Sequence, residues 1–232
     1  MVIFFDIDDT LVNQREAEAA AARALLMAYG DLLERPSSVP ELCRVWRRLR
    51  EKHAPPFLGG MISLQEHRRR RIRELFGRSG AELSAAESDA LFDFYERHYR
   101  RNWTLFDDVL PSLKALREHR YGIISNGSTA QQTLKLFRTG IDRYFDIVVF
   151  SEDAGAAKPQ PEIFLEACRQ AGSPAEGCVY VGDRLEQDAL ASRAIGMRSF
   201  WLNRTKTHQP APVDVIDSLA QLSCKLHNRM AV

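Results

Sequence analysis

The sequence predicts an α/β protein in which a Rossmann-like parallel sheet carries helices on both faces and is joined to an all-helical cap domain. Two observations support this fold class. From residue 104 onward, short apolar and β-branched runs alternate with amphipathic stretches, which is typical of βαβ units in a sheet covered on both faces. The segment 14–103 shows helical periodicity and no strand pattern.

The apolar runs are the predicted strands. The first, "VIFF", occupies residues 2–5. Four more follow it: "YGIIS" (121–125), "DIVVFS" (146–151), "CVYVG" (178–182) and "RSFWLN" (198–203). The amphipathic stretches predict helices near 108–119, 128–139, 160–171 and 185–195. After residue 203 we expect a loop and then a closing helix over 213–229.

The helical segment is expected to be an insertion between the first and second strands. Its helical stretches cover residues 16–33, 39–53, 63–76 and 84–103. We therefore predict an α/β core domain formed by residues 1–13 and 104–232, and a helical cap domain formed by residues 14–103.

The composition is that of a globular protein without a strong charge bias. The 232 residues are 45% hydrophobic and 27% charged, and 32 Lys and Arg nearly balance 31 Asp and Glu, so no global field attracts nucleic acid or a membrane. The four cysteines form no CxxC pair, which fits a reducing compartment. We find no membrane-span or signal-peptide pattern and expect a cytoplasmic protein, monomer or homodimer, without nucleic-acid or membrane partners.

Polar residues follow the predicted strands at the points where the strands end. They are Asp6, Asp8, Asp9 and Thr10 after the first strand, Ser125, Asn126 and Gly127 after the second, Lys158 after the third, and Asp183 and Asp188 after the fourth. In an open parallel sheet, ligands bind beyond the carboxyl ends of the strands. We therefore expect these side chains to converge at one edge of the sheet.

Asp6 and Asp8 suit the chemistry of phosphoryl transfer. Because they are two residues apart at a strand end, their side chains should project to the same side. One carboxylate can attack phosphorus, and the other can protonate the leaving oxygen and then activate water. Asp9 lies out of phase with this pair and should serve the turn.

The remaining polar residues suit a metal ion and a phosphoryl group. Mg²⁺ prefers oxygen ligands, and its candidate ligands are Asp6, Asp8 and Asp183. The residues expected to hold phosphoryl oxygens and stabilise the transition state are Ser125, Asn126 and Lys158. Thr10, Gly127 and Asp188 are expected to support this site.

The segments "DIDDT", "SNG", "AKPQPEIF" and "GDRLEQD" match, in order, the four motifs of the haloacid dehalogenase (HAD) superfamily. The chain resembles the phosphatase branch of that superfamily with a helical cap inserted after the first motif. The resemblance implies these roles: nucleophile for Asp6, acid and base for Asp8, phosphoryl binding for Ser125 and Lys158, metal binding for Asp183, and a nearer or outer-shell acid for Asp188. Asp9 stands where many relatives have Gly, so we expect its carboxylate to face away from the metal.

The resemblance and Asp8 together imply a Mg²⁺-dependent phosphomonoester hydrolase that acts on a small phosphorylated metabolite through an aspartyl-phosphate. Dehalogenases of the superfamily lack an acid at the position of Asp8, because halide leaves without protonation. Two alternatives stay open. A phosphosugar mutase of the same superfamily would use the same intermediate. A phospho-accepting signalling domain also clusters acids, a hydroxyl, a lysine and Mg²⁺, but its acceptor aspartate follows a middle strand and it has no comparable insert.

Overall fold

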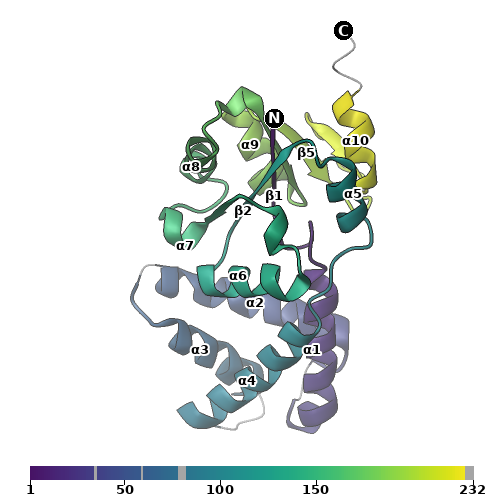
Figure 1. The fold of residues 1–232 in the computed structure, drawn as a ribbon. Helices are drawn as coiled ribbons and strands as arrows, with labels where there is room; N and C mark the ends of the chain where they lie inside the picture. Colours follow the sequence, from purple (N-terminus) through teal and green to yellow (C-terminus); the bar gives the residue numbers. More distant parts are fainter. Residues whose placement is uncertain (34–35, 59, 78–81, 228–232) are drawn as a thin grey trace. The chain divides into compact units, whose positions relative to one another are not determined.

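The computed structural model describes residues 1–33, 36–58, 60–77 and 82–227 (Figure 1). The chain divides into two compact units. The first, which we name the core unit, comprises Met1–Asn13 and Thr104–Val232, and the second, the inserted unit, comprises Gln14–Trp103. Within the described residues, no helix combines the length and the apolar character needed to cross a membrane.

The core unit contains a parallel sheet, which confirms the predicted fold class. Among the described residues it has six strands in the order β3-β2-β1-β4-β5-β6. The strands are β1 (Val2–Phe5), β2 (Arg120–Ser125), β3 (Ile147–Phe150), β4 (Cys178–Gly182), β5 (Arg198–Leu202) and β6 (Asp214–Ile216). In the register, Phe5 of β1 is level with Ile123 of β2 and Val181 of β4. The carboxyl ends of these three central strands therefore meet at one edge.

Helices cover both faces of the sheet. Those of the core unit are α5 (Val109–Ala115), α6 (Thr129–Thr139), α7 (Ser151–Ala154), α8 (Pro161–Ala171), α9 (Ala191–Ala194) and α10 (Ala220–His227), with the shorter turns η3 (Asp142–Tyr144), η4 (Ala175–Gly177) and η5 (Leu185–Leu190). The chain moves across the sheet in one direction from β1 to β3 and in the other from β4 to β6, so right-handed crossovers place the helices of these two runs on opposite faces. Figure 1 shows α8 and α9 on one face and α5 and α10 on the other.

The C-terminal part of the core unit differs from the prediction. Asp214–Ile216 forms β6, which pairs with β5, although we expected a helix over 213–229. The helix begins only at Ala220, and residues 228–229 lie outside the described residues. A strand of three residues is too short to show alternation, so its apolar residues fitted a helical pattern equally well.

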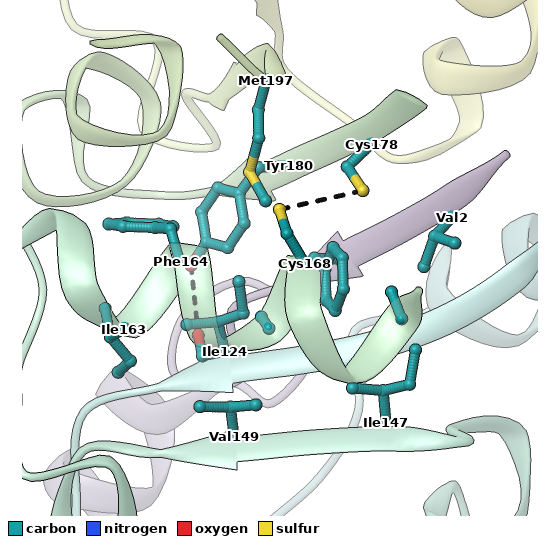
Figure 2. Packing of buried hydrophobic residues seen from close by; sticks show 13 residues of the cluster. Val2, Ile124, Ile147, Val149, Ile163, Phe164, Cys168, Cys178, Tyr180 and Met197 are labelled. Carbon is teal, nitrogen blue, oxygen red and sulfur yellow. Dashed lines mark hydrogen bonds between the residues drawn. The ribbon is translucent and has the colours of Figure 1, made fainter. Parts of the chain in front are cut away.

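A hydrophobic cluster packs one face of the sheet against α8 (Figure 2). Figure 2 shows Ile163 and Phe164 of the helix above Ile124 and Val149 of the strands. The same cluster contains Tyr180, whose ring is fully buried although its hydroxyl is polar. That hydroxyl lies on the side of the cluster nearest the strand ends and connects the core to the site described below.

Every described secondary-structure element of the inserted unit is a helix, as predicted. It contains α1 (Gln14–Tyr29), η1 (Gly30–Leu32), α2 (Val39–Leu58), α3 (Leu64–Phe76) and α4 (Ala85–Arg101). Serine side chains cap two of these helices: Ser63 accepts from the N–H of Glu66, and Ser84 forms a reciprocal capping box with Glu87. Buried aromatic side chains fill its centre, and the ring centroids of Trp46 and Tyr95 lie 4.4 Å apart.

The two chain segments that lead into the insertion are held together within the core unit. Val12 and Leu105 form an antiparallel bridge, and the N–H of Asn13 donates to the carbonyl of Thr104 at 2.9 Å. The insertion therefore begins and ends at neighbouring positions of the core.

Close packing at Gly122 generates a stability prediction. A Cβ at Gly122 of β2 would overlap the ring of Phe4, which is fully buried, and would lie 3.3 Å from the Cβ of Ile147. Gly122→Ala should lower the free energy of unfolding by about 1–3 kcal/mol, because overpacking forces buried side chains to shift. Urea denaturation measures this change. Gly77→Ala is the control, since a Cβ there meets nothing within 4 Å; equal stability changes in the two variants would contradict the packing argument.

Candidate active site

The turn after β1 places the first aspartates. Asp6 continues the line of the strand, and its N–H donates to the carbonyl of Val181 on β4 at 3.0 Å. The chain then turns tightly, and the N–H groups of Leu11 and Val12 both donate to the carbonyl of Ile7 at 2.9 Å. These backbone bonds hold the segment from which the side chains of the first motif project.

Lys158 joins the predicted acids in a buried cluster. Lys158 is only 5% exposed, and its Nζ donates to Asp6 Oδ1 at 2.6 Å, to Asp188 Oδ1 at 2.7 Å and to the hydroxyl of Tyr180 at 2.9 Å. Burial lowers the pKa of Lys158, but the carboxylates of Asp188 and Asp6 outweigh burial and raise this pKa overall. Lys158 is therefore charged at neutral pH and directs its three protons into the site.

Tyr180 is a residue of this cluster that the sequence analysis did not identify. Its hydroxyl donates its single proton either to the carbonyl of Ile124 at 3.1 Å, the bond drawn in Figure 2, or to Asp188 Oδ1 at 3.0 Å. Burial, followed by the charges of Asp188 and Asp6, raises the pKa of Tyr180 well above its usual range. The hydroxyl therefore stays neutral and can both accept from Lys158 and donate.

Three carboxylates come together beside Lys158. Asp6, Asp183 and Asp188 each have an oxygen within 4.8 Å of the others. Burial raises the pKa of Asp6 to about 6, with Lys158 opposing this rise and the charge of Asp188 adding to it. Burial, followed by the charges of Asp6 and Asp188, raises the pKa of Asp183 to about 8. An excess of negative charge in a buried site produces such shifts.

The acidic group fits a divalent cation. Three carboxylates and the ammonium of Lys158 leave two negative charges in excess, and carboxylate oxygens are the ligands that Mg²⁺ prefers. The group differs from the predicted ligand set in one member. Asp188 belongs to it, whereas the carboxylate of Asp8 is bound by residues of α6, so Asp8 as a metal ligand stays a prediction.

Asp188 reaches the group because β4 ends in a glycine. A Cβ at Gly182 would lie 2.5 Å from Cβ and Cγ of Asp188, so any larger residue would displace that side chain. Asp188 Oδ2 also accepts from the N–H of Arg184 at 3.0 Å, at the start of the π-helical turn η5. The spacing of the "GDRLEQD" segment therefore supplies both a carboxylate and the room for it.

Asp9 adopts the left-handed conformation, with φ of +60°. Aspartate tolerates this conformation better than most residues other than Gly. We expected the Asp9 carboxylate to face away from the metal. That orientation stays a prediction. After burial and the charges of Asp6 and Asp188, the charge of Asp9 is a minor cause of the raised pKa of Asp183. The negative charge of Asp9 therefore adds to that of the acidic group.

The loop after β2 is tied to the loop that carries Lys158. Asn126 Nδ2 donates to the carbonyl of Lys158 at 2.9 Å, and Asn126 Oδ1 accepts from the N–H of Lys158 at 2.8 Å. The side chain of Asn126 thus joins two loops, and phosphoryl binding by Asn126 and the amides around it stays a prediction. Ser125 is 1% exposed and its Oγ accepts from Nε2 of Gln132 at 3.1 Å. The N–H of Gly127 donates to Ser151 Oγ at 3.0 Å.

Asp8 contacts two residues of α6 that the sequence analysis missed. Nζ of Lys135 forms an ion pair with Asp8 Oδ1, and Nε2 of Gln132 donates to Asp8 Oδ2 at 3.0 Å. Both α6 residues are buried. A signal was present in the sequence, since Gln132 and Lys135 share a helix face with the apolar Leu136.

Comparison with known proteins shows the family. A family model described as haloacid dehalogenase-like hydrolase matches residues 1–196. The chain belongs to this family. The predictions of a HAD hydrolase and of an enzyme are confirmed.

Similar proteins cover nearly the whole HAD-like chain. It is 32% identical over 217 residues to the glyceraldehyde 3-phosphate phosphatase of Methanopyrus kandleri, a match that covers 90% of this chain and 87% of that protein. The HAD-hydrolase YfnB of Bacillus subtilis, bound to magnesium, has a TM-score of 0.76 with 23% identity, covering 97% of this chain and 98% of YfnB. A 2-haloacid dehalogenase of Pseudomonas syringae pv. Tomato has a TM-score of 0.69 with 29% identity, covering 99% of each chain.

In this HAD-like hydrolase, an ion pair braces the turn after β1. Nη2 of Arg204 donates to the carbonyl of Thr10 at 2.8 Å, and the same guanidinium binds both oxygens of Asp108 at 2.9 Å. Asp108 Oδ2 also accepts from Ser218 Oγ at 2.7 Å and from the N–H of Leu219 at 2.8 Å. Thr10 therefore supports the turn through its carbonyl; its buried Oγ1 has no hydrogen-bond partner within the part of the chain that the structure describes.

The brace predicts a pH-dependent contribution to stability. Burial raises the pKa of Asp108, but Arg204 and Ser218 outweigh burial and lower this pKa overall. Because the folded pKa lies below the unfolded one, Asp108 stabilises the fold above about pH 4 and loses that contribution as pH falls further. Asp108→Asn should lower the free energy of unfolding at pH 7 by on the order of 2 kcal/mol.

Urea denaturation between pH 7 and pH 3 tests this expectation. The difference between wild type and Asp108→Asn should shrink below about pH 4. The exposed Asp142 provides a control, since Asp142→Asn should change stability little at either pH. A difference for Asp108→Asn that is the same at all pH values would contradict the assignment.

Proposed function

We propose that the chain is a Mg²⁺-dependent phosphomonoester hydrolase that acts on a small phosphorylated metabolite through an aspartyl-phosphate. One observation carries the proposal: two carboxylates, two residues apart, have different environments. Asp6 lies in the buried acidic group beside Lys158, whereas Asp8 is bound separately by Lys135. Carboxylates that are held in different environments can divide nucleophilic from acid and base roles.

In the first step, a carboxylate oxygen of Asp6 would form a bond to phosphorus while the bond from phosphorus to the leaving oxygen breaks. The electron pair stays with the leaving oxygen, and Asp8 would give it a proton. The groups that would support this step come from the loops after the neighbouring strands. The ammonium of Lys158 and the hydroxyl of Ser125 would donate to the phosphoryl oxygens, with Asn126 and Gly127 supporting that loop.

In the second step, Asp8 would take a proton from water while the water oxygen attacks phosphorus. The bond between phosphorus and Asp6 breaks, which releases inorganic phosphate and restores the Asp6 carboxylate. Asp8 then carries the proton needed for the next cycle. The residue that acts as acid in one step therefore acts as base in the other.

The acidic group is the proposed metal site. Asp6, Asp183 and Asp188 would hold Mg²⁺, which when bound neutralises charge on the phosphoryl group. The excess of negative charge in the group and the raised pKa values of Asp6 and Asp183 support this assignment.

The proposed substrate class rests on a relative and on Asp8. The curated relative is a glyceraldehyde 3-phosphate phosphatase, which supports a small phosphorylated metabolite as substrate. The similarity to a 2-haloacid dehalogenase raises dehalogenation as a competing activity. Halide needs no proton on departure, so an acid held beside the nucleophile by Lys135 and Gln132 favours an alkoxide leaving group.

From the proposed role of Asp6 as nucleophile, we predict that Asp6→Asn abolishes activity. Without that carboxylate no aspartyl-phosphate can form, so hydrolysis of 4-nitrophenyl phosphate with Mg²⁺ should fall to the background rate. Release of 4-nitrophenol measures the effect, and the exposed Asp142→Asn serves as control with wild-type activity expected. Unchanged turnover in Asp6→Asn would refute the mechanism.

The metal site predicts that Mg²⁺ stabilises the fold. At a concentration 100 times its dissociation constant, Mg²⁺ should raise the melting temperature by roughly 5–10 °C relative to a chelator. Asp183→Asn removes a carboxylate of the acidic group and should abolish most of this shift. Calorimetry measures this shift of the melting temperature without any substrate. A shift that is the same in wild type and Asp183→Asn would rule out this site.

A further inference from the structure

We propose that Lys135 and Gln132 of α6 are positioning residues that hold the Asp8 carboxylate in its orientation for proton transfer. Gln132 also fixes Asp8 relative to Ser125. This inference rests on the proposed function, because it needs Asp8 to be the acid and base of the reaction.

The first observation is the polar character of the buried face of α6. Gln132, Lys135 and Leu136 are three and four residues apart, so they lie on the same side of the helix, and all three are buried. Lys135 is 0% exposed. A helix that covers a sheet normally turns apolar residues inward. An amide and an ammonium on this face therefore require a specific partner.

The second observation is that Asp8 is that partner. Burial of a lysine ammonium costs several kcal/mol unless an opposite charge is close. Nζ of Lys135 pairs with Asp8 Oδ1, and Nε2 of Gln132 donates to the other oxygen, Oδ2, at 3.0 Å. Because both oxygens are bound from the same helix, rotation of the carboxylate is restrained. The orientation of Asp8 is therefore set by α6 as well as by its own loop.

The third observation connects Asp8 with the proposed phosphoryl-binding hydroxyl. Nε2 of Gln132 also donates to Ser125 Oγ at 3.1 Å and approaches the carbonyl of Asn126 at 3.3 Å. Since Ser125 Oγ accepts a hydrogen bond from Gln132, its own hydroxyl hydrogen can be donated to another oxygen. One amide nitrogen thus sets both the place of the acid and base and the direction in which Ser125 donates.

Gly127 provides the space for this amide. A Cβ at Gly127 would lie 3.0 Å from Nε2 of Gln132 and 3.2 Å from its Cγ. The φ of Gly127, +152°, also disfavours any larger residue. A side chain at this position would push Gln132 away from Ser125 and Asp8. The glycine of the "SNG" segment therefore supports the site by leaving room for Gln132.

The consequence is a dependence on the leaving group. A general acid helps only when its proton is held within hydrogen-bond reach of the departing oxygen, and displacement by about 1 Å can cost about 10²-fold in rate. Leaving groups that depart readily as anions need no such help. Loss of Lys135 or Gln132 should therefore affect poor leaving groups selectively, whereas general damage to the site would affect all substrates alike.

The test compares kcat/KM for phenyl phosphate, which has a poor leaving group, with that for 2,4-dinitrophenyl phosphate, which has a good one. The variants are Lys135→Met and Gln132→Met, which keep side-chain length and remove the donors. The matched controls are Lys114→Met, at an exposed position of α5, and Gln131→Met, on α6 beside Gln132. Circular dichroism and melting temperature establish that each variant is folded.

In both test variants, kcat/KM for phenyl phosphate should fall by on the order of 10²-fold. In Lys135→Met, kcat/KM for 2,4-dinitrophenyl phosphate should stay close to the wild-type value. In Gln132→Met it should fall less than that for phenyl phosphate, because this variant also releases Ser125. Both controls should match wild type on both substrates. Equal losses on the two substrates would overturn the proposal. If Lys135→Met does not fold, Gln132→Met decides alone, since it removes no charge.

A double-mutant cycle with Asp8→Asn tests whether Lys135 acts through Asp8. In the Asp8→Asn background, adding Lys135→Met should cause no further loss on phenyl phosphate, because residues that act as a unit are not additive. A further loss as large as that in wild type would overturn the proposal.

Wild type separates this inference from the proposed function. If wild type hydrolyses neither phosphate with Mg²⁺, the proposed function fails and this inference fails with it. If wild type is active and Asp6→Asn is not, but the α6 variants lose activity uniformly, only the positioning role of Lys135 and Gln132 is refuted.

Discussion

A buried ammonium holds the candidate site together. Lys158 donates to Asp6, Asp188 and Tyr180, three residues that come from the end of β1, the turn after β4, and β4 itself. Removing one partner of a buried ion pair leaves an uncompensated charge, which commonly costs several kcal/mol. The backbone of Lys158 is held in turn by the side chain of Asn126. One side chain therefore links the turns that follow these strands, in addition to the sheet hydrogen bonds between β1 and β4.

A buried lysine pairs with an aspartate at two places in the core unit. Lys158 pairs with Asp6 within the acidic group, and Lys135 of α6 pairs with Asp8. Each lysine is buried, so each pairing is strong and local. The two aspartates are thereby kept from sharing one environment, although they are only two residues apart. The division of labour that we propose for them rests on which lysine each one contacts.

Much of this arrangement could be predicted from the sequence, because short apolar strands followed by polar residues predict convergence at a sheet edge. Asp6, Lys158, Asp183 and Asp188 do converge. The contacts that could not be predicted come from residues within helices and strands rather than at strand ends. Tyr180 belongs to an apolar run, which does not indicate that its hydroxyl contacts charged residues. Gln132 and Lys135 share a helix face with Leu136, which indicates burial but does not identify Asp8 as their partner.

Two further differences have similar causes. The sixth strand is too short to show a period, and its edge position depends on pairing with β5, which the local pattern does not encode. The partners of the Asp8 carboxylate were not predicted, and Asp8 as a metal ligand stays a prediction. Its partners come from residues more than 100 positions away, and only the packing of α6 against the strand ends reveals them.

The bridge between Val12 and Leu105 has a consequence for how this protein could change over evolution. Hydrogen bonds of the core hold the two ends of the insertion next to each other. These bonds largely offset the entropic cost of closing that long segment. The length and sequence of the insertion can then vary without a large effect on the strands that carry the carboxylates. The inserted unit is in this sense an exchangeable module of the fold.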